Sequence, residues 1–336
     1  MINQKIKLIR PGVFLSSFSC EESLEDKILV RPTVLSICAA DQRYFCGNRP
    51  KEVLAAKLPM CLIHEAIGEV LYDPFGCYAT GQNVILLPNA GNNEKSRNYA
   101  TDSFFRSSSV DGFTQEFVGL RKNEVIPFFS HHPKYYVFSE LISVCYQAIS
   151  QVPSEKWKNS ESVGVWGDGV VGYLLSFCIK DQYPTLEVKV FGRHEEKLAL
   201  SSHADVTEIF QKDRRISPSL DIAFEAVGGI KAGDAINEIL SSVRSQAFIC
   251  LTGVSESRVP INTRYILEKG LTLVGTSRSL SRDFKQAKSL LDKLEEYSPL
   301  DKVISNELVI TSCDDLKEAF YKDQKVPFKT LLKWEI

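Results

Sequence analysis

The chain has no long apolar run. No stretch approaches the ~18 to 20 consecutive apolar residues that span a bilayer, and the N-terminal sequence MINQKIKLIRPG lacks the apolar segment of a signal peptide. We therefore expect a cytoplasmic protein that does not bind a membrane. A large excess of charge of one sign is also missing, because the formal net charge is −2. This balance gives no reason to expect a nucleic-acid partner.

A disulfide framework is absent as well. The nine cysteines form an odd and widely scattered set, which argues against a secreted disulfide-rich fold. None of them lies between residues 89 and 111, a polar stretch that reads NAGNNEKSRNYATDSFFRSSSVD. A stretch of this composition predicts a long loop, and long loops inside compact domains are usually functional or mobile.

The 336 residues are too many for one ordinary compact core and predict two domains with a cleft for a small molecule. Up to about residue 150, short β-like runs alternate with turn residues, as in KILVRPTVLSIC, GEVLYDPFG and NVILLPN. From residue 162 the runs VGVW, YLLSFCI and EVKVFG have the spacing of a βαβ unit. The later runs LDIAFEAVG, SQAFICLTGV and LTLVGTS, with the helical pattern IKAGDAINEILSSV, predict an α/β fold with a parallel sheet.

The glycine-rich run Gly167–Gly172 predicts a dinucleotide site. Its three glycines suit a tight turn, a close approach of the backbone to a pyrophosphate, and close packing of helix on strand. A lone motif of this kind is weak evidence, but here the strand before it and the helix after it are both present. Asp168 inside the run would repel a pyrophosphate unless its side chain turns away.

The residues after the second strand of this unit favour NADPH over NADH. An acidic residue there would bind the ribose hydroxyls of NAD, but the chain has Phe191-Gly192-Arg193-His194. Arg193, with Lys197, could pair with a 2′-phosphate instead. The alternative is that Arg193 is a solvated surface charge.

A group of metal-binding residue types precedes this unit. Cys38 offers a thiolate, His64 an imidazole, and Glu65 or Glu140 a carboxylate, a set that suits a catalytic zinc ion. Taken one at a time, each is more simply a core or surface residue. Their sequence contexts, taken together, favour the metal site.

Those contexts resemble the zinc-dependent medium-chain dehydrogenases across essentially the whole chain. The matching segments, in order, are CAAD from Cys38, IHEAIGEV from Ile63, DGF from Asp111, ELISV from Glu140 and GDGVVG from Gly167. Within that superfamily the chain is most similar to bacterial ribulose-5-phosphate reductases, also called ribitol-5-phosphate dehydrogenases. The stretches SICAADQRYFCGNR, FFRSSSVDGF, WGDGVVGY, FEAVGG, LEKGLTLVGTSRS and KTLLKW carry this resemblance.

The resemblance implies a GroES-like catalytic domain at 1–150 plus 280–336 and a Rossmann domain at 151–279. It implies reduction of D-ribulose 5-phosphate by NADPH, with zinc polarising the C2 carbonyl. The product, ribitol 5-phosphate, would supply CDP-ribitol for teichoic acid or capsule polymers of the cell wall. A ribitol-5-phosphate cytidylyltransferase partner and a homo-oligomeric state are implied in the same way.

It also implies roles for single residues. Cys38, His64 and Glu140 would bind the metal, and Glu65 would be a fourth ligand or displace another during turnover. Asp41 would either support the ligands or be an ordinary turn carboxylate. The four closely spaced cysteines of a structural zinc lobe are missing, so we expect one zinc ion. Further residues with implied roles are Val170 and Val171 at the start of the nucleotide-binding helix, and Lys329 against the pyrophosphate.

Two roles stay open at this stage. Ala40 stands where many relatives carry a proton-relaying Ser or Thr, so the proton would come from water at the metal, from Glu65, or from Tyr44. For the substrate phosphate the candidates are Arg43, Arg106 and Arg278, because bidentate arginine is an efficient phosphate donor. At least one of the three is expected to be irrelevant.

Three other functions are compatible with parts of this pattern. An NAD-linked dehydrogenase of an unphosphorylated polyol would not need Arg193 or the extra arginines. A non-catalytic NADPH-binding relative would have lost the metal ligands, which are present here. A zinc-free quinone reductase would lack the contexts of Cys38 and His64.

Overall fold

The computed structural model describes residues 1–20, 25–90, 99, 103–210, 219–294 and 296–336. The chain divides into two compact units, Met1–Ser143 with Ser279–Ile336, and Val144–Arg278. The first boundary lies inside a helix, before the position expected from the sequence. No helix in the described ranges is long and apolar enough to cross a membrane.

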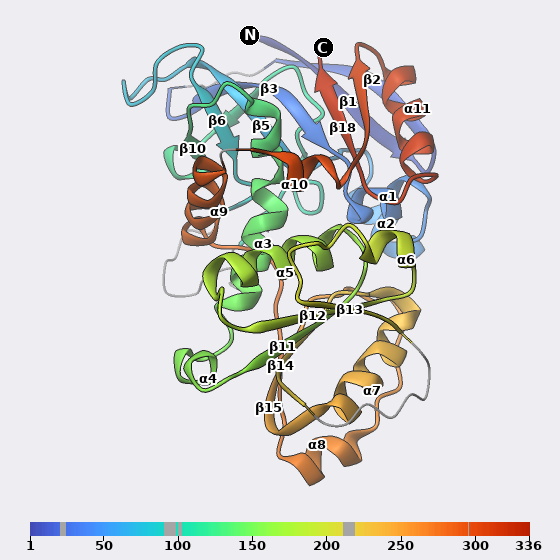
Figure 1. The fold of residues 1–336 in the computed structure, drawn as a ribbon. Coiled ribbons are helices and arrows are strands. Elements are labelled where there is room, and N and C mark those ends of the chain that lie inside the picture. The colour runs from blue at the N-terminus through green and yellow to red at the C-terminus, as the bar shows by residue number, and fades with distance from the viewer. Residues whose placement is uncertain (21–24, 91–98, 100–102, 211–218, 295) are drawn as a thin grey trace. The chain divides into compact units, whose positions relative to one another are not determined.

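The first unit is rich in β-structure (Figure 1). Its larger sheet has the order β10-β6-β5-β3-β18-β17, with β9 paired to β3, and a smaller sheet has the order β2-β1-β4. Neighbouring strands of the larger sheet are antiparallel except for β17 and β18, which are parallel. The strand bounds are β1 (Ile2–Arg10), β2 (Val13–Cys20), β3 (Ile28–Ser36), β4 (Met60–Cys61), β5 (Glu65–Tyr72), β6 (Asn83–Leu86), β9 (Val118–Leu120), β10 (Val125–Pro127), β17 (Ile304–Ile310) and β18 (Lys329–Trp334).

The segment expected to be a long loop has short strands at its two ends. Asn89–Ala90 (β7) and Phe104–Phe105 (β8) pair antiparallel, and most of the residues between them lie outside the described part of the chain. The helices that begin in this unit are α1 (Ala39–Phe45), α2 (Lys51–Lys57), α3 (Ser139–Ile149), α9 (Ser281–Lys293), α10 (Ser298–Asp301) and α11 (Cys313–Asp323), with short 3₁₀ turns at Lys122–Glu124 and Pro133–Phe138.

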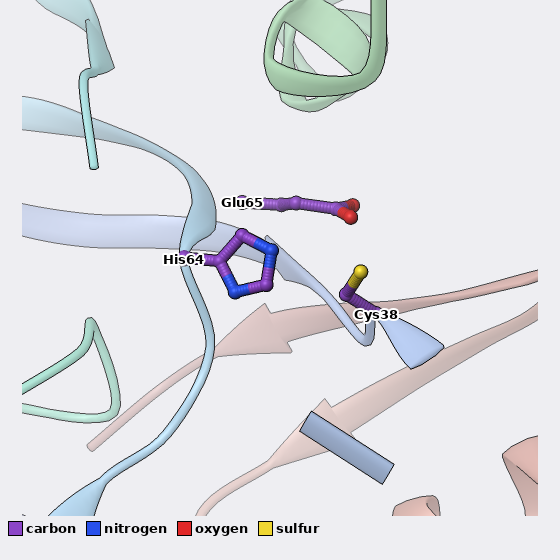
Figure 2. A group of neighbouring side chains, drawn as sticks. All are labelled: Cys38, His64 and Glu65. Atoms are coloured by element: carbon purple, nitrogen blue, oxygen red, sulfur yellow. The ribbon is translucent and has the colours of Figure 1, made fainter. Parts of the chain in front are cut away.

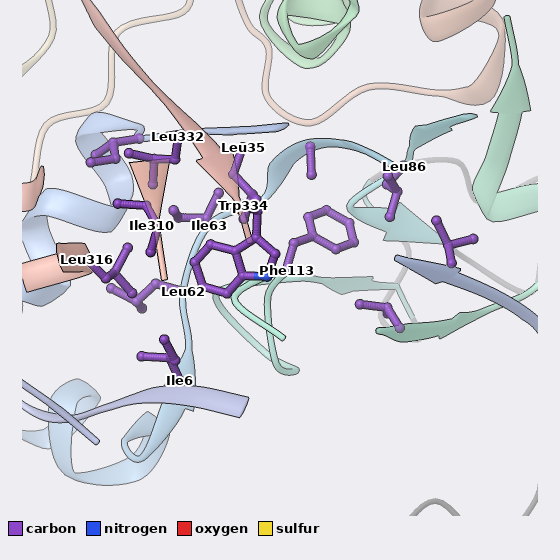
Figure 3. Close-up of a cluster of buried hydrophobic side chains, with 14 of the residues drawn as sticks. Ile6, Leu35, Leu62, Ile63, Leu86, Phe113, Ile310, Leu316, Leu332 and Trp334 are labelled. Atoms are coloured by element: carbon purple, nitrogen blue, oxygen red, sulfur yellow. The ribbon is translucent and has the colours of Figure 1, made fainter. Parts of the chain in front are cut away.

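The core of this unit joins the two ends of the chain. Figure 3 shows Trp334 of β18 packed beside Phe113, with side chains of β1 and β3 in the same cluster. The indole Nε1 of Trp334 donates to the carbonyl of Gln115 at 2.8 Å, so this buried polar atom is satisfied. The C-terminal strand is therefore part of the first unit's core.

The second unit is a parallel six-stranded sheet with the order β13-β12-β11-β14-β15-β16. Helices α5 and α7 cover opposite faces of the sheet (Figure 1). This arrangement confirms the predicted α/β class with a Rossmann-type sheet. The bounds are β11 (Ser162–Trp166), β12 (Glu187–Gly192), β13 (Val206–Ile209), β14 (Leu220–Glu225), β15 (Val243–Leu251), β16 (Thr272–Gly275), α4 (Ser154–Lys158), α5 (Val170–Gln182), α6 (Glu195–Leu198), α7 (Ala232–Ser242), α8 (Thr263–Lys269) and a 3₁₀ turn at Gly229–Lys231.

Candidate functional site

Cys38, His64 and Glu65 form one cluster in the first unit. Ser36 of β3 lies opposite Glu65 of β5 in the antiparallel register, so the residues just after β3 and at the start of β5 come together. One ligand atom from each of the three side chains lies within 4.8 Å of the others, and Figure 2 shows the side chains converging on a common space. His64 is 4% and Glu65 0% exposed, which is unusual for polar side chains that bind nothing.

The backbone before His64 is strained. Ile63 has a φ of 66°, a conformation that a β-branched residue rarely adopts. Two hydrogen bonds hold it there, from Ile63 N–H to Asp41 Oδ1 at 3.0 Å and from Phe113 N–H to the Ile63 carbonyl at 2.8 Å. A Cβ on the neighbouring Gly112 would lie 2.2 Å from the Leu62 carbonyl oxygen, so the close approach of the two segments requires glycine. Strain of this kind is concentrated at functional sites.

Asp41, on α1, contacts the cluster. Its carboxylate is fully buried and accepts hydrogen bonds from Cys38 N–H at 3.1 Å and Ser107 Oγ at 2.6 Å, and its Oδ1 lies 3.5 Å from His64 Nδ1. Burial alone would raise the pKa of Asp41, but the interactions with His64, Ser107 and Cys38 outweigh it and lower the pKa. The ionised carboxylate therefore fixes the orientation of the imidazole.

The site is electrostatically unusual. Burial raises the pKa of the Cys38 thiol. For His64, burial lowers the pKa, but the adjacent Asp41 and Cys38 raise it well above its ordinary value. Several acidic groups thus share a buried space, and such a space suits a cation.

Glu140, at the start of α3, is not among the three side chains whose ligand atoms converge. It is 7% exposed and interacts electrostatically with His64, Glu65 and Lys329. Burial, with a contribution from the charge on Glu65, raises its pKa to about 7. Its role as a ligand therefore stays a prediction.

Lys329 lies in the same cluster. Its ammonium, 5% exposed, is 2.7 Å from Glu65 Oε2 and donates to Glu65 Oε1 at 3.0 Å and to the Ile37 carbonyl. The ion pair competes with binding of a metal by Glu65. In this structure Lys329 forms an ion pair with Glu65. Its contact with a pyrophosphate stays a prediction.

The three arginines proposed for the substrate phosphate occupy different surroundings. The Arg106 side chain is 11% exposed, its Nη1 donates to the Asp111 carbonyl at 3.3 Å, and its Nη2 lies 3.7 Å from Glu124 Oε2. Burial lowers the pKa of Arg106. These contacts hold Arg106 beside Ser107, and its role toward the substrate phosphate stays a prediction. Arg43 lies on α1, and Arg278 is the last residue of the second unit, with a φ of 60°.

Tyr44 has an environment that its sequence context did not indicate. The ring is 1% exposed, with the Arg49 guanidinium 4.9 Å and the Lys57 ammonium 6.0 Å from its centroid. Lys57 also donates to Ser108 Oγ at 2.9 Å. Ser107 and Ser108 both belong to the quoted FFRSSSVDGF segment, which carried the resemblance but received no residue-level role.

The glycine turn of the second unit has the geometry that dinucleotide binding needs. Gly167 has a φ of +140°, and a Cβ there would lie 2.7 Å from the Ala226 carbonyl oxygen. A Cβ on Gly172 would lie 1.9 Å from the Gly167 carbonyl oxygen, whereas one on Gly169 would meet nothing within 4 Å. Gly169 caps α5, whose first residues are Val170 and Val171. A helix N-terminus of this kind can offer N–H groups to a phosphate.

A cavity of about 320 Å³ lies at this turn. The side chains that line it include Trp166 and Phe191, whose rings stack 4.1 Å apart, and Arg193, which lies 5.7 Å from the Phe210 ring centroid. The predicted Lys197 lies on α6 and is not among the lining residues. Sequence reasoning missed Lys231, a lining residue that follows the Gly228-Gly229 pair after β14.

The chain is similar to known proteins over its full length. No family model matches the chain. The chain is 38% identical to ribulose-5-phosphate reductase 1 of Staphylococcus aureus, with 99% of each chain covered, and 38% identical to ribulose-5-phosphate reductase of Bacillus spizizenii over the full length of both. The solved structure of S. aureus TarJ in complex with NADPH covers all of both chains at 35% identity, with a TM-score of 0.88. The chain belongs to the ribulose-5-phosphate reductase family.

Proposed function

We propose that this protein reduces D-ribulose 5-phosphate to D-ribitol 5-phosphate with NADPH. The observation that carries the proposal is the 38% identity with named ribulose-5-phosphate reductases over nearly the whole chain. The relative solved with NADPH supports the cofactor. Arg193, in the cavity beside the glycine turn, offers the positive charge that a 2′-phosphate requires.

The donor set of the first unit fits a zinc ion. A thiol, an imidazole and a carboxylate are typical ligands of catalytic zinc, and Glu140 adds a second carboxylate in electrostatic contact. Zinc bound there would supply Lewis-acid stabilisation of negative charge on the C2 oxygen. Cys38 and His64 would hold the ion from two different segments, and Asp41 would keep the imidazole in its binding orientation.

During the reaction the C2 carbon gains a hydride from the nicotinamide, and its oxygen gains a proton. No Ser or Thr follows Cys38 directly, because Ala39 and Ala40 stand there. We propose that Glu65, whose carboxylate lies in the converging cluster, takes up a proton from water and passes it to this oxygen. Tyr44, buried beneath Arg49, is the second candidate.

Replacing Asp41 tests the proposed metal site without removing a ligand. Asp41→Asn is expected to weaken zinc binding about 10- to 100-fold, because the neutral amide no longer fixes the His64 ring. Zinc affinity is measured by competition with a chelator. Asp73→Asn is the matched control, because Asp73 also accepts backbone hydrogen bonds but holds a surface turn. Equal zinc affinity in all three proteins would rule out this role.

Two glycine variants test the nucleotide site. Gly172→Ala is expected to lower the free energy of unfolding by about 3 kcal/mol, because the new methyl group meets backbone that cannot rotate away. Gly169→Ala meets no protein atom, so it should fold normally and weaken only the binding of NADPH. Chemical denaturation and NADPH titration separate the two effects. Normal stability of Gly172→Ala would contradict the packing described above.

The substrate phosphate remains to be placed. We propose that at least one of Arg43, Arg106 and Arg278 binds it, because a guanidinium matches a phosphate with two donors. Arg106 also contacts Glu124 and Asp111 within the fold. Single Ala variants are compared by their KM for ribulose 5-phosphate. A raised KM identifies a phosphate partner, and an unchanged KM in all three variants contradicts the proposal.

The activity is tested by following the absorbance of NADPH with ribulose 5-phosphate as substrate. NADH and unphosphorylated ribulose serve as the parallel controls. The proposal predicts rapid oxidation only when NADPH and ribulose 5-phosphate are both present. Equal rates with ribulose and NADH would indicate a general polyol dehydrogenase instead.

The proposal extends to the cellular location, the oligomeric state and the use of the product. We place the enzyme in the cytoplasm as a homo-oligomer that supplies CDP-ribitol synthesis for teichoic acid or capsule polymers. A ribitol-5-phosphate cytidylyltransferase would consume its product. Co-purification of the two enzymes, or faster coupled turnover than the free intermediate allows, tests this partnership.

A further inference from the structure

The Asp168 side chain is directed at the turn after β12. Its Oδ2 accepts hydrogen bonds from the backbone N–H groups of Arg193 at 2.6 Å and His194 at 2.8 Å. The Asp168 side chain lies so close to Gly192 that a Cβ added to Gly192 would be 2.5 Å from the Asp168 Cβ. Asp168 thus connects the glycine turn after β11 to the turn after β12.

The same oxygen also contacts an imidazole. Asp168 Oδ2 lies 2.9 Å from His194 Nδ1. Burial tends to raise the pKa of Asp168, but the hydrogen bonds from His194 and Arg193 outweigh it and lower the pKa. An ionised carboxylate only accepts hydrogen bonds, so Nδ1 must carry the proton.

The other ring nitrogen of His194 is available to a ligand. The side chain is 49% exposed, lines the cavity beside Arg193, and has no hydrogen-bond partner at Nε2 among the described residues. An imidazole whose Nδ1 is held by a carboxylate is fixed in orientation, and its protonated form offers Nε2–H as a charge-assisted donor.

We propose that Asp168 and His194 form a pair that selects the 2′-phosphate of NADPH, in which His194 Nε2 donates to the phosphate and Asp168 positions the ring. This inference rests on the proposed function only for its cofactor. Arg193 supplies the second cation from the same turn, and the same Asp168 oxygen positions its backbone. The turn thereby places two donors, from Arg193 and His194, in fixed positions to bind the 2′-phosphate dianion.

The charge of Asp168 itself does not oppose this assignment. A carboxylate at the end of the second strand is what marks an NAD site, since it binds the ribose hydroxyls. Here the carboxylate comes from the glycine turn, is 15% exposed, and has three donors from Arg193 and His194 on one oxygen. This oxygen therefore accepts hydrogen bonds from the turn after β12 and does not mark a site for the ribose hydroxyls of NAD.

Direct titration with NADPH and with NADH, without sugar, tests the pair. His194→Ala is expected to raise the Kd for NADPH about tenfold, the worth of one charge-assisted hydrogen bond, and to change the Kd for NADH less than about twofold. Asp168→Asn should reduce the preference for NADPH in the same direction. Glu196→Ala is the control, because Glu196 is exposed on α6 and outside the cavity lining. It should leave the ratio of the two Kd values unchanged.

Two outcomes would overturn the inference. The inference fails if His194→Ala leaves the ratio of the Kd values for NADH and NADPH unchanged, including when it weakens the binding of both cofactors equally. Asp168 and His194 would then only connect the two turns. Asp168→Asn can fail to fold, but His194→Ala keeps both backbone hydrogen bonds to Asp168 and removes only a half-exposed ring. Selective NADPH binding without any reduction of ribulose 5-phosphate would refute the proposed function and leave this inference standing.

Discussion

Cys38→Ala is expected to lower kcat for ribulose 5-phosphate reduction by about 10³ and to abolish stoichiometric zinc. The thiol is one of three converging donors, and its loss leaves only His64 and a carboxylate that Lys329 also holds. Lewis-acid stabilisation of the reacting oxygen is worth several kcal/mol, and about 4 kcal/mol corresponds to this factor. Metal content by mass spectrometry and the steady-state rate are measured on the same sample.

Cys46→Ala provides the matched control for this experiment. Cys46 lies at the C-terminal end of α1, is exposed, and is not part of the converging group. It should retain zinc and full activity. If Cys38→Ala also kept its zinc and its rate, the ion would have to be held elsewhere or be unnecessary for the reaction.

Lys329→Met is expected to lower the free energy of unfolding of the metal-free protein by about 3–5 kcal/mol. Lys329 and Glu65 are 5% and 0% exposed at the side chain, so removing the ammonium leaves a buried carboxylate without its partner. Chemical denaturation of the chelator-treated protein measures the change. The double variant Glu65→Gln with Lys329→Met should recover part of it, because no buried charge is then left unpaired.

Lys333 on the same strand offers the comparison. Its ammonium lies 2.6 Å from Glu335, but the two side chains are 68% and 44% exposed. Exposed ion pairs contribute about 0–1 kcal/mol, so Lys333→Met should have little effect. Similar losses for Lys329→Met and Lys333→Met would show that burial of the first pair does not determine its energy.

The local elements were predictable because their patterns are strong. The apolar runs at 162–166 and 187–192 form β11 and β12, and the glycine run between them forms the turn before α5. The return of β18 to the first unit followed from the resemblance. Apolar periodicity alone does not show which sheet a strand joins.

The partners of individual side chains were less predictable. The sequence context of Cys38 and His64 indicated a metal site, but the Glu65–Lys329 pair joins residues far apart in sequence and depends on how β18 pairs with β3. Asp168 raised a concern about repulsion, which the structure resolves through hydrogen bonds to the turn after β12. Such contacts depend on tertiary packing that sequence spacing does not specify.

The proposed reaction is tested by the product formed from ribulose 5-phosphate and NADPH deuterated at both C4 positions of its nicotinamide. We expect ribitol 5-phosphate that carries one deuterium at C2, seen by mass spectrometry and located by NMR. Formation should stop when zinc is removed and resume when it is restored. Zinc-replete protein that binds NADPH but yields no deuterated ribitol 5-phosphate would contradict the proposed reaction.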